Sequence, residues 1–187
     1  MKPALILVDI QNDYFPNGRL ELSGIRAAGE KARQLLLLFR EYHWPTFHVQ
    51  HISIQKNAAF FIPNTTGVEF HDCIKPLQGE PLIQKHFPNS FRETGLRDKL
   101  KKKHIKQIVI CGAMSHMCVD ATTRAAFDYG FNCVVIQDAC ATKDLEFGGE
   151  TIQAAMVHGS FMAALKSVYA RVLSVAEFKS EFKTGTN

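Results

Sequence analysis

Short apolar runs alternate along this chain with longer stretches that have helical periodicity. The first run, Ala4–Val8, is apolar at every position, which is typical of a strand buried on both faces of a sheet. A later run, residues 105–111, has the same character. Strands that alternate with helices predict a parallel sheet with helices on both faces. We therefore expect an α/β fold, a three-layer α/β/α sandwich around a central, mainly parallel sheet.

The expected elements follow one another over nearly the whole chain. Strands are expected at 4–8, 46–51, 82–84, 105–111, 132–137 and 167–172, and helices at 25–42, 94–103, 117–129, 149–165 and 174–183. Residues 52–80 carry Pro63, Gly67, Pro76 and Gly79, and we expect a long surface excursion there with room for one short strand. The 187 residues suffice for one domain, and we expect residues 1–187 to form it.

Composition and charge exclude several classes of function. No apolar run has the length of a membrane span, and Asp9 interrupts the opening "MKPALILVDIQ" too early for a signal peptide, so we expect no membrane partner. The five cysteines have no paired spacing, which predicts a reduced, cytoplasmic protein. The formal charge of +4 is dispersed, and the basic cluster at 99–106 lacks interleaved aromatic residues, so we expect no nucleic-acid partner.

Reactive side chains stand where several expected strands end. In an open parallel sheet, ligands bind outside the carboxyl ends of the strands. Asp9 follows the first strand, Lys85 follows the third, and Cys118 opens the helix after the fourth. His51 closes the second strand, and Asp138 follows the fifth, where it is expected to fix a loop or a subunit contact. We therefore expect an acid, an amine and a thiol at one edge of the sheet.

These residue types could together form a nucleophilic site. Cysteine attacks as the thiolate, and a free thiol with a pKa of about 8.5 is mostly protonated at neutral pH. The first turn of a helix and the ammonium of Lys85 would both favour the anion at Cys118. Asp9 could take the thiol proton and later give it to a leaving group. The backbone N–H of Cys118 and of a residue just before it could stabilise an oxyanion.

Three blocks of the chain carry a family pattern in a fixed order. They are "LILVDIQNDYFPNGRLEL", "IQKHFPNSFRETGLRDKL" and "IVICGAMSHMCVDATTRAAFDYGFNCVVIQDAC". The first resembles a strand followed by Asp-x-Gln-Asn-Asp-Phe, the second a Lys followed by Ser-x-Phe, and the third a Gly-x-x-Thr-x-x-Cys-Val block. Together they resemble the isochorismatase-like cysteine hydrolase superfamily, which includes nicotinamidases and carbamoylsarcosine amidohydrolases.

The resemblance implies a catalytic triad of Asp9, Lys85 and Cys118, with one residue from each block. It implies a non-proline cis peptide at Ala113–Met114 and an oxyanion hole formed by the N–H groups of Met114 and Cys118. The implied reaction is hydrolysis of a C–N bond in a small amide through a thioester on Cys118. The implied assembly is a homodimer or a homotetramer.

The region after the second strand departs from one branch of the family. Nicotinamidases bind a divalent metal there through an Asp-x-His pair, whereas the chain reads "FHVQHISIQ" and offers His51 and Ser53. His48 and His51 are three residues apart, so a strand sends them to opposite faces. We predict no catalytic metal and no other cofactor. Isochorismatases proper lack the nucleophilic cysteine, so Cys118 also argues against that activity.

Six further residues are candidates for substrate contact, and each has a structural alternative. They are Gln11, Tyr14, His51, Phe91, Ser115 and His116. Aromatic rings near strand ends line pockets or fill the core. Gln11 could instead bond the loop around Asp9, and the histidines could lie on the surface. The whole chain also has an alternative function, as a non-catalytic or redox-active protein that binds a small molecule in the same pocket.

Overall fold

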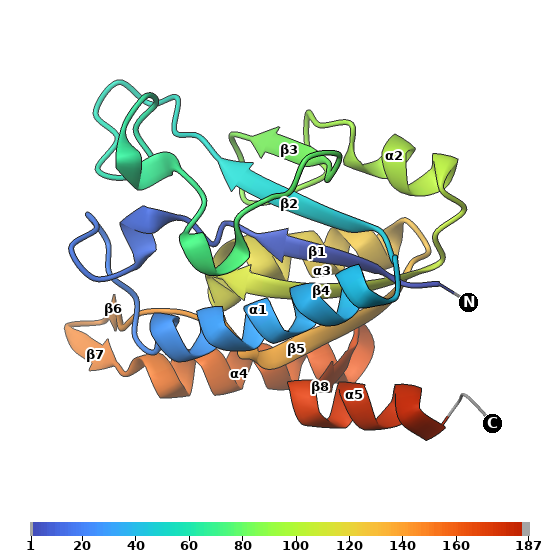
Figure 1. Cartoon of the computed structure of the whole chain (residues 1–187). Coiled ribbons are helices and arrows are strands. Elements are labelled where there is room, and N and C mark those ends of the chain that lie inside the picture. Colours follow the sequence, from blue (N-terminus) through green and yellow to red (C-terminus); the bar gives the residue numbers. More distant parts are fainter. Residues whose placement is uncertain (1, 185–187) are drawn as a thin grey trace.

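The structure is a computed structural model that describes residues 2–184, and within this range six strands form one parallel sheet. The strands are β1 (Ala4–Val8), β2 (Thr46–His51), β3 (Leu82–Lys85), β4 (Gln107–Ala113), β5 (Asn132–Ala141) and β8 (Arg171–Leu173). Their order across the sheet is β3-β2-β1-β4-β5-β8, and every neighbouring pair is parallel (Figure 1). The predicted sheet is confirmed.

Helices cover both faces of this sheet. They are α1 (Ile25–Glu41), α2 (Leu96–Lys102), α3 (Asp120–Asp128), α4 (Ala154–Val168) and α5 (Val175–Thr184). The pair α1 and α5 packs on one face, and the pair α3 and α4 packs on the other (Figure 1). The fold is therefore the expected three-layer α/β/α sandwich. Among residues 2–184, no helix has both the length and the apolar character that a membrane crossing requires.

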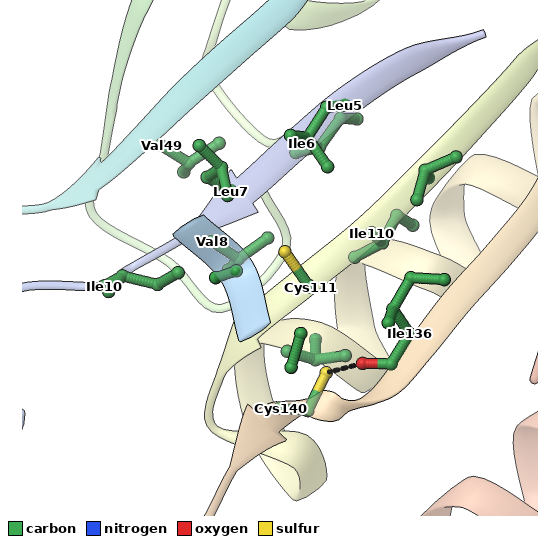
Figure 2. Packing of buried hydrophobic residues seen from close by; sticks show 14 of the residues in the cluster. Leu5, Ile6, Leu7, Val8, Ile10, Val49, Ile110, Cys111, Ile136 and Cys140 are labelled. Atoms are coloured by element: carbon green, nitrogen blue, oxygen red, sulfur yellow. Dashed lines mark hydrogen bonds between the residues drawn. The ribbon is translucent and has the colours of Figure 1, made fainter. Parts of the chain in front are cut away.

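The strand β1 lies at the centre of the core. All five of its residues are completely buried, because neighbouring strands pair with both of its edges and helices cover both of its faces. Figure 2 shows its side chains beside Val49 of β2 and Ile110 of β4. An uninterrupted apolar run is what such a position requires, since neither face of the strand meets water.

Several expected boundaries of helices and strands were wrong in the carboxyl-terminal half of the chain. Residues 149–153 do not begin a helix; instead β6 (Leu145–Phe147) and β7 (Glu150–Ile152) form an antiparallel hairpin. Gly148 and Gly149 both have positive φ in its turn, a conformation that favours glycine. The helix α4 continues to Val168, and the last strand is correspondingly short.

The long excursion at 52–80 holds only short helical turns, η2 (Thr66–Val68) and η3 (Asp72–Ile74). A third such turn, η1 (Asn12–Tyr14), follows β1. An isolated bridge between Gln11 and Phe70 joins the excursion to the segment after β1. The excursion thus lies next to the end of β1, where the first candidate residue stands.

Candidate active site

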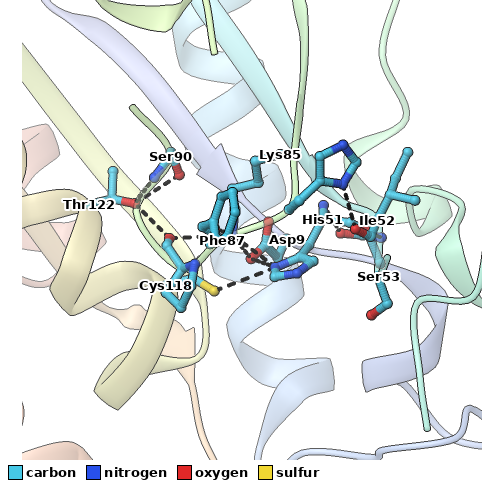
Figure 3. Close-up of polar contacts among 12 residues, drawn as sticks. Asp9, His51, Ile52, Ser53, Lys85, Phe87, Ser90, Cys118 and Thr122 are labelled. Carbon is cyan, nitrogen blue, oxygen red and sulfur yellow. Dashed lines mark hydrogen bonds and ion pairs between the residues drawn. The ribbon is translucent and has the colours of Figure 1, made fainter. Parts of the chain in front are cut away.

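The carboxyl ends of four adjacent strands deliver four reactive side chains to one place. β1 leads into Asp9, β2 ends at His51, β3 ends at Lys85, and β4 leads through the turn η4 (Ser115–Val119) to Cys118. The parallel register sets His51 beside Lys85, so these strand ends are level. Figure 3 shows the four side chains pointing toward one another. The structure brings the three predicted triad residues together and adds His51 to them.

Two backbone features let β1 and β4 meet so closely at the site. Asp9 has φ of +52°, a left-handed conformation that is uncommon outside glycine and that turns the chain immediately after the strand. Gly112 lies beside Val8 and has φ of +128°. A Cβ atom at Gly112 would stand 2.0 Å from the carbonyl oxygen of Val8. Only glycine fits there, which explains the first residue of the "GAMSHMC" segment.

Lys85 is a buried ammonium with a full set of acceptors. Its Nζ lies 2.8 Å from Oδ2 of Asp9, donates to the Phe87 carbonyl at 3.1 Å, and lies 3.1 Å from Nδ1 of His51. Burial by itself would lower the pKa of Lys85, but the charge of Asp9 outweighs it and raises the pKa. Lys85 is therefore held as the cation.

Cys118 is almost completely buried, with 4% of its surface exposed. Burial raises the pKa of its thiol well above the usual value, the charge of Asp9 raises it further, and Lys85 opposes both effects. Lys85 thus favours the thiolate, as expected, but burial and the charge of Asp9 outweigh it. The reason is that a site closed to water penalises the anion more than one shared cation stabilises it. The resting group is a thiol beside a carboxylate.

The turn before Cys118 contains the cis peptide Ala113–Met114 that the family resemblance implies. The hydroxyl of Ser115 is fully buried, lies 2.8 Å from Nδ1 of His158 and donates to the Ala141 carbonyl. Nδ1 of His116 lies 2.6 Å from Oγ1 of Thr142. These contacts anchor the turn to β5 and α4. Substrate contact by Ser115 or His116 stays a prediction, as do the oxyanion donors at Met114 and Cys118.

Gln11 is fully buried, and both the nitrogen and the oxygen of its side-chain amide form hydrogen bonds with the backbone. Nε2 donates to the carbonyls of His51 and Val68, and Oε1 accepts from the His51 N–H at 2.8 Å. The side chain thereby ties the end of β2 to the excursion. This placement favours the structural alternative for Gln11 over contact with a substrate.

The two aromatic candidates have different surroundings. Tyr14 is 1% exposed and packs on Phe61 with ring centroids 4.6 Å apart; burial raises its pKa, and the charge of nearby Asp9 adds to the shift. Phe91 instead packs against Tyr129 and Phe131, which follow the end of α3, whereas Cys118 precedes its start. Tyr14 thus lies at the site, and the placement of Phe91 favours the core alternative.

Asp13 organises the wall of the site, a role that was not predicted. Its two carboxylate oxygens accept from the N–H groups of Arg19 and Phe61, the latter at 2.6 Å. Gly67 lies directly under this carboxylate, where a Cβ would stand 2.1 Å from Oδ1. Phe61 has a positive φ of +55°, and its ring lies 5.8 Å from that of His51. The Asn-Asp pair in the first sequence block was the available signal.

A second supporting pair, Ser90 and Thr122, was also missed. The N–H and hydroxyl of Ser90 lie 3.1 and 2.8 Å from Oγ1 of Thr122, which stands one helical turn after Cys118. The pair ties the loop that carries the Phe87 carbonyl to α3 (Figure 3). The serine of the Ser-x-Phe block was a signal for Ser90, whereas nothing in the sequence marked Thr122. Asp138 lies outside the site, where its Oδ1 accepts from the Val175 N–H at the start of α5.

The metal site of nicotinamidases does not fit these residues. His48 faces away from the site and contacts Glu80 at 2.8 Å, and Ser53 donates its hydroxyl proton to the Phe60 carbonyl. Ligand atoms of Asp9, His51 and Cys118 do lie within 4.8 Å of one another. However, the Lys85 ammonium stands within hydrogen-bond distance of Asp9 and His51 and would repel a dication there.

Known proteins share this fold and sequence pattern. A family described as the Isochorismatase domain matches residues 3–174. The uncharacterized isochorismatase family protein YddQ of Bacillus subtilis is 49% identical over 178 residues, which cover 95% of this chain and 99% of YddQ. The crystal structure of an isochorismatase from Pseudomonas putida superimposes with a TM-score of 0.89 at 35% identity, covering 94% of this chain and 89% of that one.

Relatives named for an activity are hydrolases. A streptothricin hydrolase of Streptomyces noursei is 30% identical and covers 82% of this chain and 55% of its own length. The maleamate amidohydrolase of Pseudomonas putida is 25% identical and covers 73% of this chain and 71% of its own length. The fold and these relatives support a hydrolase of C–N bonds. The chain belongs to the isochorismatase family.

Proposed function

We propose that this protein hydrolyses the C–N bond of a small amide with Cys118 as the nucleophile. The observation that carries the proposal is the convergence of Asp9, Lys85 and Cys118, from three separate strand ends, in one buried cluster. Burying a lysine and a carboxylate destabilises the fold unless the two charges pair, and such buried charges are often found at catalytic sites. The names of the amidohydrolase relatives support the same reaction class.

The first half of the proposed reaction forms a thioester. The thiol proton of Cys118 passes to the carboxylate of Asp9 while the sulfur attacks the amide carbonyl carbon. The carbonyl electron pair moves to its oxygen, which the N–H groups of Met114 and Cys118 stabilise. As the C–N bond breaks, Asp9 returns the proton to the leaving nitrogen, and ammonia or an amine departs.

The second half restores the enzyme. Asp9, again a carboxylate, takes a proton from a water molecule, and the resulting hydroxide attacks the thioester carbonyl carbon. The C–S bond breaks, the carboxylic acid leaves, and the proton on Asp9 returns to the sulfur. Lys85 remains charged throughout; it holds Asp9 in place and offsets the negative charge that passes between oxygen and sulfur.

Intact-mass spectrometry tests this proposal directly. The protein is incubated with a panel of small primary and secondary amides, and release of ammonia or amine is followed in parallel. We expect an acyl mass on the native chain that is absent from Cys118→Ala and present in Cys133→Ala, whose cysteine is equally buried but lies in β5. Undiminished turnover by Cys118→Ala would contradict the proposal. Binding of an amide without any adduct would favour the alternative of a non-catalytic binding protein.

We also infer that the chain forms one domain and assembles as a homodimer or homotetramer. The support for assembly is the helix α4, which exposes Met156 and Val168 to solvent by 66% and 61%. Each of these apolar side chains is available for a subunit contact that would remove it from water. Light scattering during size-exclusion chromatography measures the mass in solution, and a mass of one chain would contradict the inference.

A further inference from the structure

His51 is held rigidly at the edge of the catalytic cluster. Its backbone N–H donates to Oε1 of Gln11, and its carbonyl accepts from Nε2 of the same side chain. Its ring lies beside Phe61 on one side, and its Nδ1 atom lies 3.1 Å from Nζ of Lys85. Backbone and ring are therefore both fixed before any ligand arrives, which is the property that a selective contact requires.

Lys85 decides which ring nitrogen of His51 carries the proton. An ammonium has three donors and no acceptor, so Nδ1 of His51 must accept from Lys85. Burial lowers the pKa of His51 to about 4, and the charge of Lys85 also opposes protonation while that of Asp9 favours it. The ring is therefore neutral at pH 7, and its single proton is on Nε2.

The same contact prevents His51 from acting as the base for Cys118. The Sγ atom lies 4.0 Å from Nδ1, but the lone pair of that nitrogen is already engaged by Lys85. Asp9 also lies beyond hydrogen-bond distance of Nδ1, at 3.9 Å. His51 therefore contributes something other than thiol deprotonation.

The Nε2–H group has no hydrogen-bond partner within residues 2–184. It is also not sealed inside the protein, since the buried side-chain polar atoms that make no hydrogen bond in this range belong to Asp9, which is instead ion-paired with Lys85, and to Thr46 and His48. The His51 side chain is 16% exposed, whereas Asp9 and Lys85 are completely enclosed. Nε2 is separated from Nδ1 by one ring carbon, on the ring whose Nδ1 atom faces Cys118 (Figure 3).

We propose that the Nε2–H group of His51 donates a hydrogen bond to a second oxygen of the substrate, carried a few bonds beyond the amide that Cys118 attacks. The preferred substrate is then a short amide with an additional carbonyl or carboxylate group. Lys85 has a second role in this arrangement, because it fixes the His51 tautomer in which Nε2 carries the proton and can donate it in a hydrogen bond. This inference rests on the proposed function for the assignment of the ligand as an amide.

Three four-carbon probes test the proposal in the Cys118→Ala protein, where binding is measured without turnover. Succinamate carries a second carboxylate, succinamide carries a second carbonyl, and butyramide carries neither. Calorimetry gives the dissociation constant of each. We expect succinamate, succinamide or both to bind about tenfold more tightly than butyramide, a difference equivalent to about 1.4 kcal/mol. Preference for succinamate alone identifies a carboxylate, and preference for both identifies a carbonyl oxygen.

Two substitutions separate the donor role from a role in holding Lys85. In His51→Asn the shorter amide can still accept from Lys85 but has no donor at the position of Nε2. In His51→Gln the longer amide places an N–H near Nε2 but gives up the acceptor at Nδ1. We expect His51→Asn to abolish the tenfold preference without weakening butyramide, and His51→Gln to keep most of it. Thermal unfolding of each variant confirms that it is folded.

The reverse pattern, with the preference kept in His51→Asn and lost in His51→Gln, would show that His51 only positions Lys85 and would overturn the proposal. Equal binding of all three probes to the protein with native His51 would also overturn it. The proposed function is judged separately by the acyl adduct on native Cys118. A His51-dependent preference without any adduct would refute the proposed hydrolase and support the proposed donor role of His51. An adduct without such a preference would support the hydrolase and refute the donor role.

Discussion

Nζ of Lys85 lies 2.8 Å from Oδ2 of Asp9, and neither side chain exposes any surface to solvent. Two opposite charges enclosed together depend on each other, because either one alone would be a buried, uncompensated ion. The same pair holds the base and the cation that the proposed reaction needs. Stability and activity are therefore coupled at this contact.

Replacing Lys85 by Met should reduce stability and abolish activity together. We expect Lys85→Met to form no acyl adduct and to lose about 3–5 kcal/mol of unfolding free energy, because Asp9 is left without its partner. The matched control is the double variant Asp9→Asn with Lys85→Met, which removes both charges and should recover much of that stability while staying inactive. Urea denaturation at pH 7 measures the difference. Equal stabilities of the single and double variants would contradict the expected coupling.

The thiol of Cys118 should react slowly with alkylating reagents. Since burial and the charge of Asp9 raise its pKa, the rate of modification by iodoacetamide should still be rising above pH 9. Asp9→Asn removes the negative charge and should make Cys118 react faster at pH 8. Site-resolved mass spectrometry follows the rate. A plateau below pH 8.5 in the native protein would mean that Lys85 dominates over burial.

Gly112→Ala should be strongly destabilising. The added Cβ would meet the Val8 carbonyl oxygen at 2.0 Å, and φ of +128° is unfavourable for alanine. We expect a loss of at least about 3 kcal/mol, because β1 and β4 must separate just where they deliver Asp9 and Cys118. Gly130→Ala is the control: it has φ of +82° but open space around its Cβ, so it should cost about 1 kcal/mol. Similar melting temperatures for the two variants would refute this account.

Asp13→Asn should loosen the wall beside His51. Both carboxylate oxygens accept from backbone N–H groups, and an amide must present its own NH₂ to one of them. We expect a loss of about 1–3 kcal/mol and faster amide hydrogen exchange over residues 60–68. Asp72→Asn, at an aspartate whose side chain is 91% exposed, should change neither. Unchanged exchange in Asp13→Asn would show that other contacts hold the excursion.

The stability of the fold should decrease as the pH is lowered, first because of His48 and then because of Glu80. Burial lowers the pKa of His48 below 6.5, although Glu80 opposes the shift, so the unfolded chain takes up this proton first and stability declines as the pH falls from about 6.5. Burial would raise the pKa of Glu80, but Arg40 and other donors lower it to about 2, so its contribution is present above about pH 4.5 and is lost between 4.5 and 2.

The variant His48→Gln isolates the first of these effects. Gln keeps a donor for Glu80 at the position of Nε2 but has no titrating group. Urea denaturation at pH 5, 6, 7 and 8 should give a smaller loss of stability between pH 7 and pH 5 than in the native protein. The decline below pH 4.5 should remain. An identical profile in the two proteins would exclude His48 as a source of the acid sensitivity.

Some features were predictable because they depend on neighbouring residues in the chain. The apolar run Ala4–Val8 is a central strand, and Thr46–His51 has the bounds that were expected. The hairpin at 145–152 was missed although Gly148 and Gly149 are a hairpin signal, because the apolar residues of α4 extended the apparent helical pattern backward. Periodicity identifies an element more reliably than it locates its ends.

The sequence by itself determined the alternation of strands and helices, and with it the sheet edge at which Asp9, Lys85 and Cys118 gather. The tertiary structure decided their chemical state. The raised pKa of Cys118, the tautomer of His51 and the packing of Phe91 against Tyr129 each depend on side chains that are far away in sequence. The physical reason is that solvation and charge act through space, so a side chain acquires its properties only when distant segments enclose it.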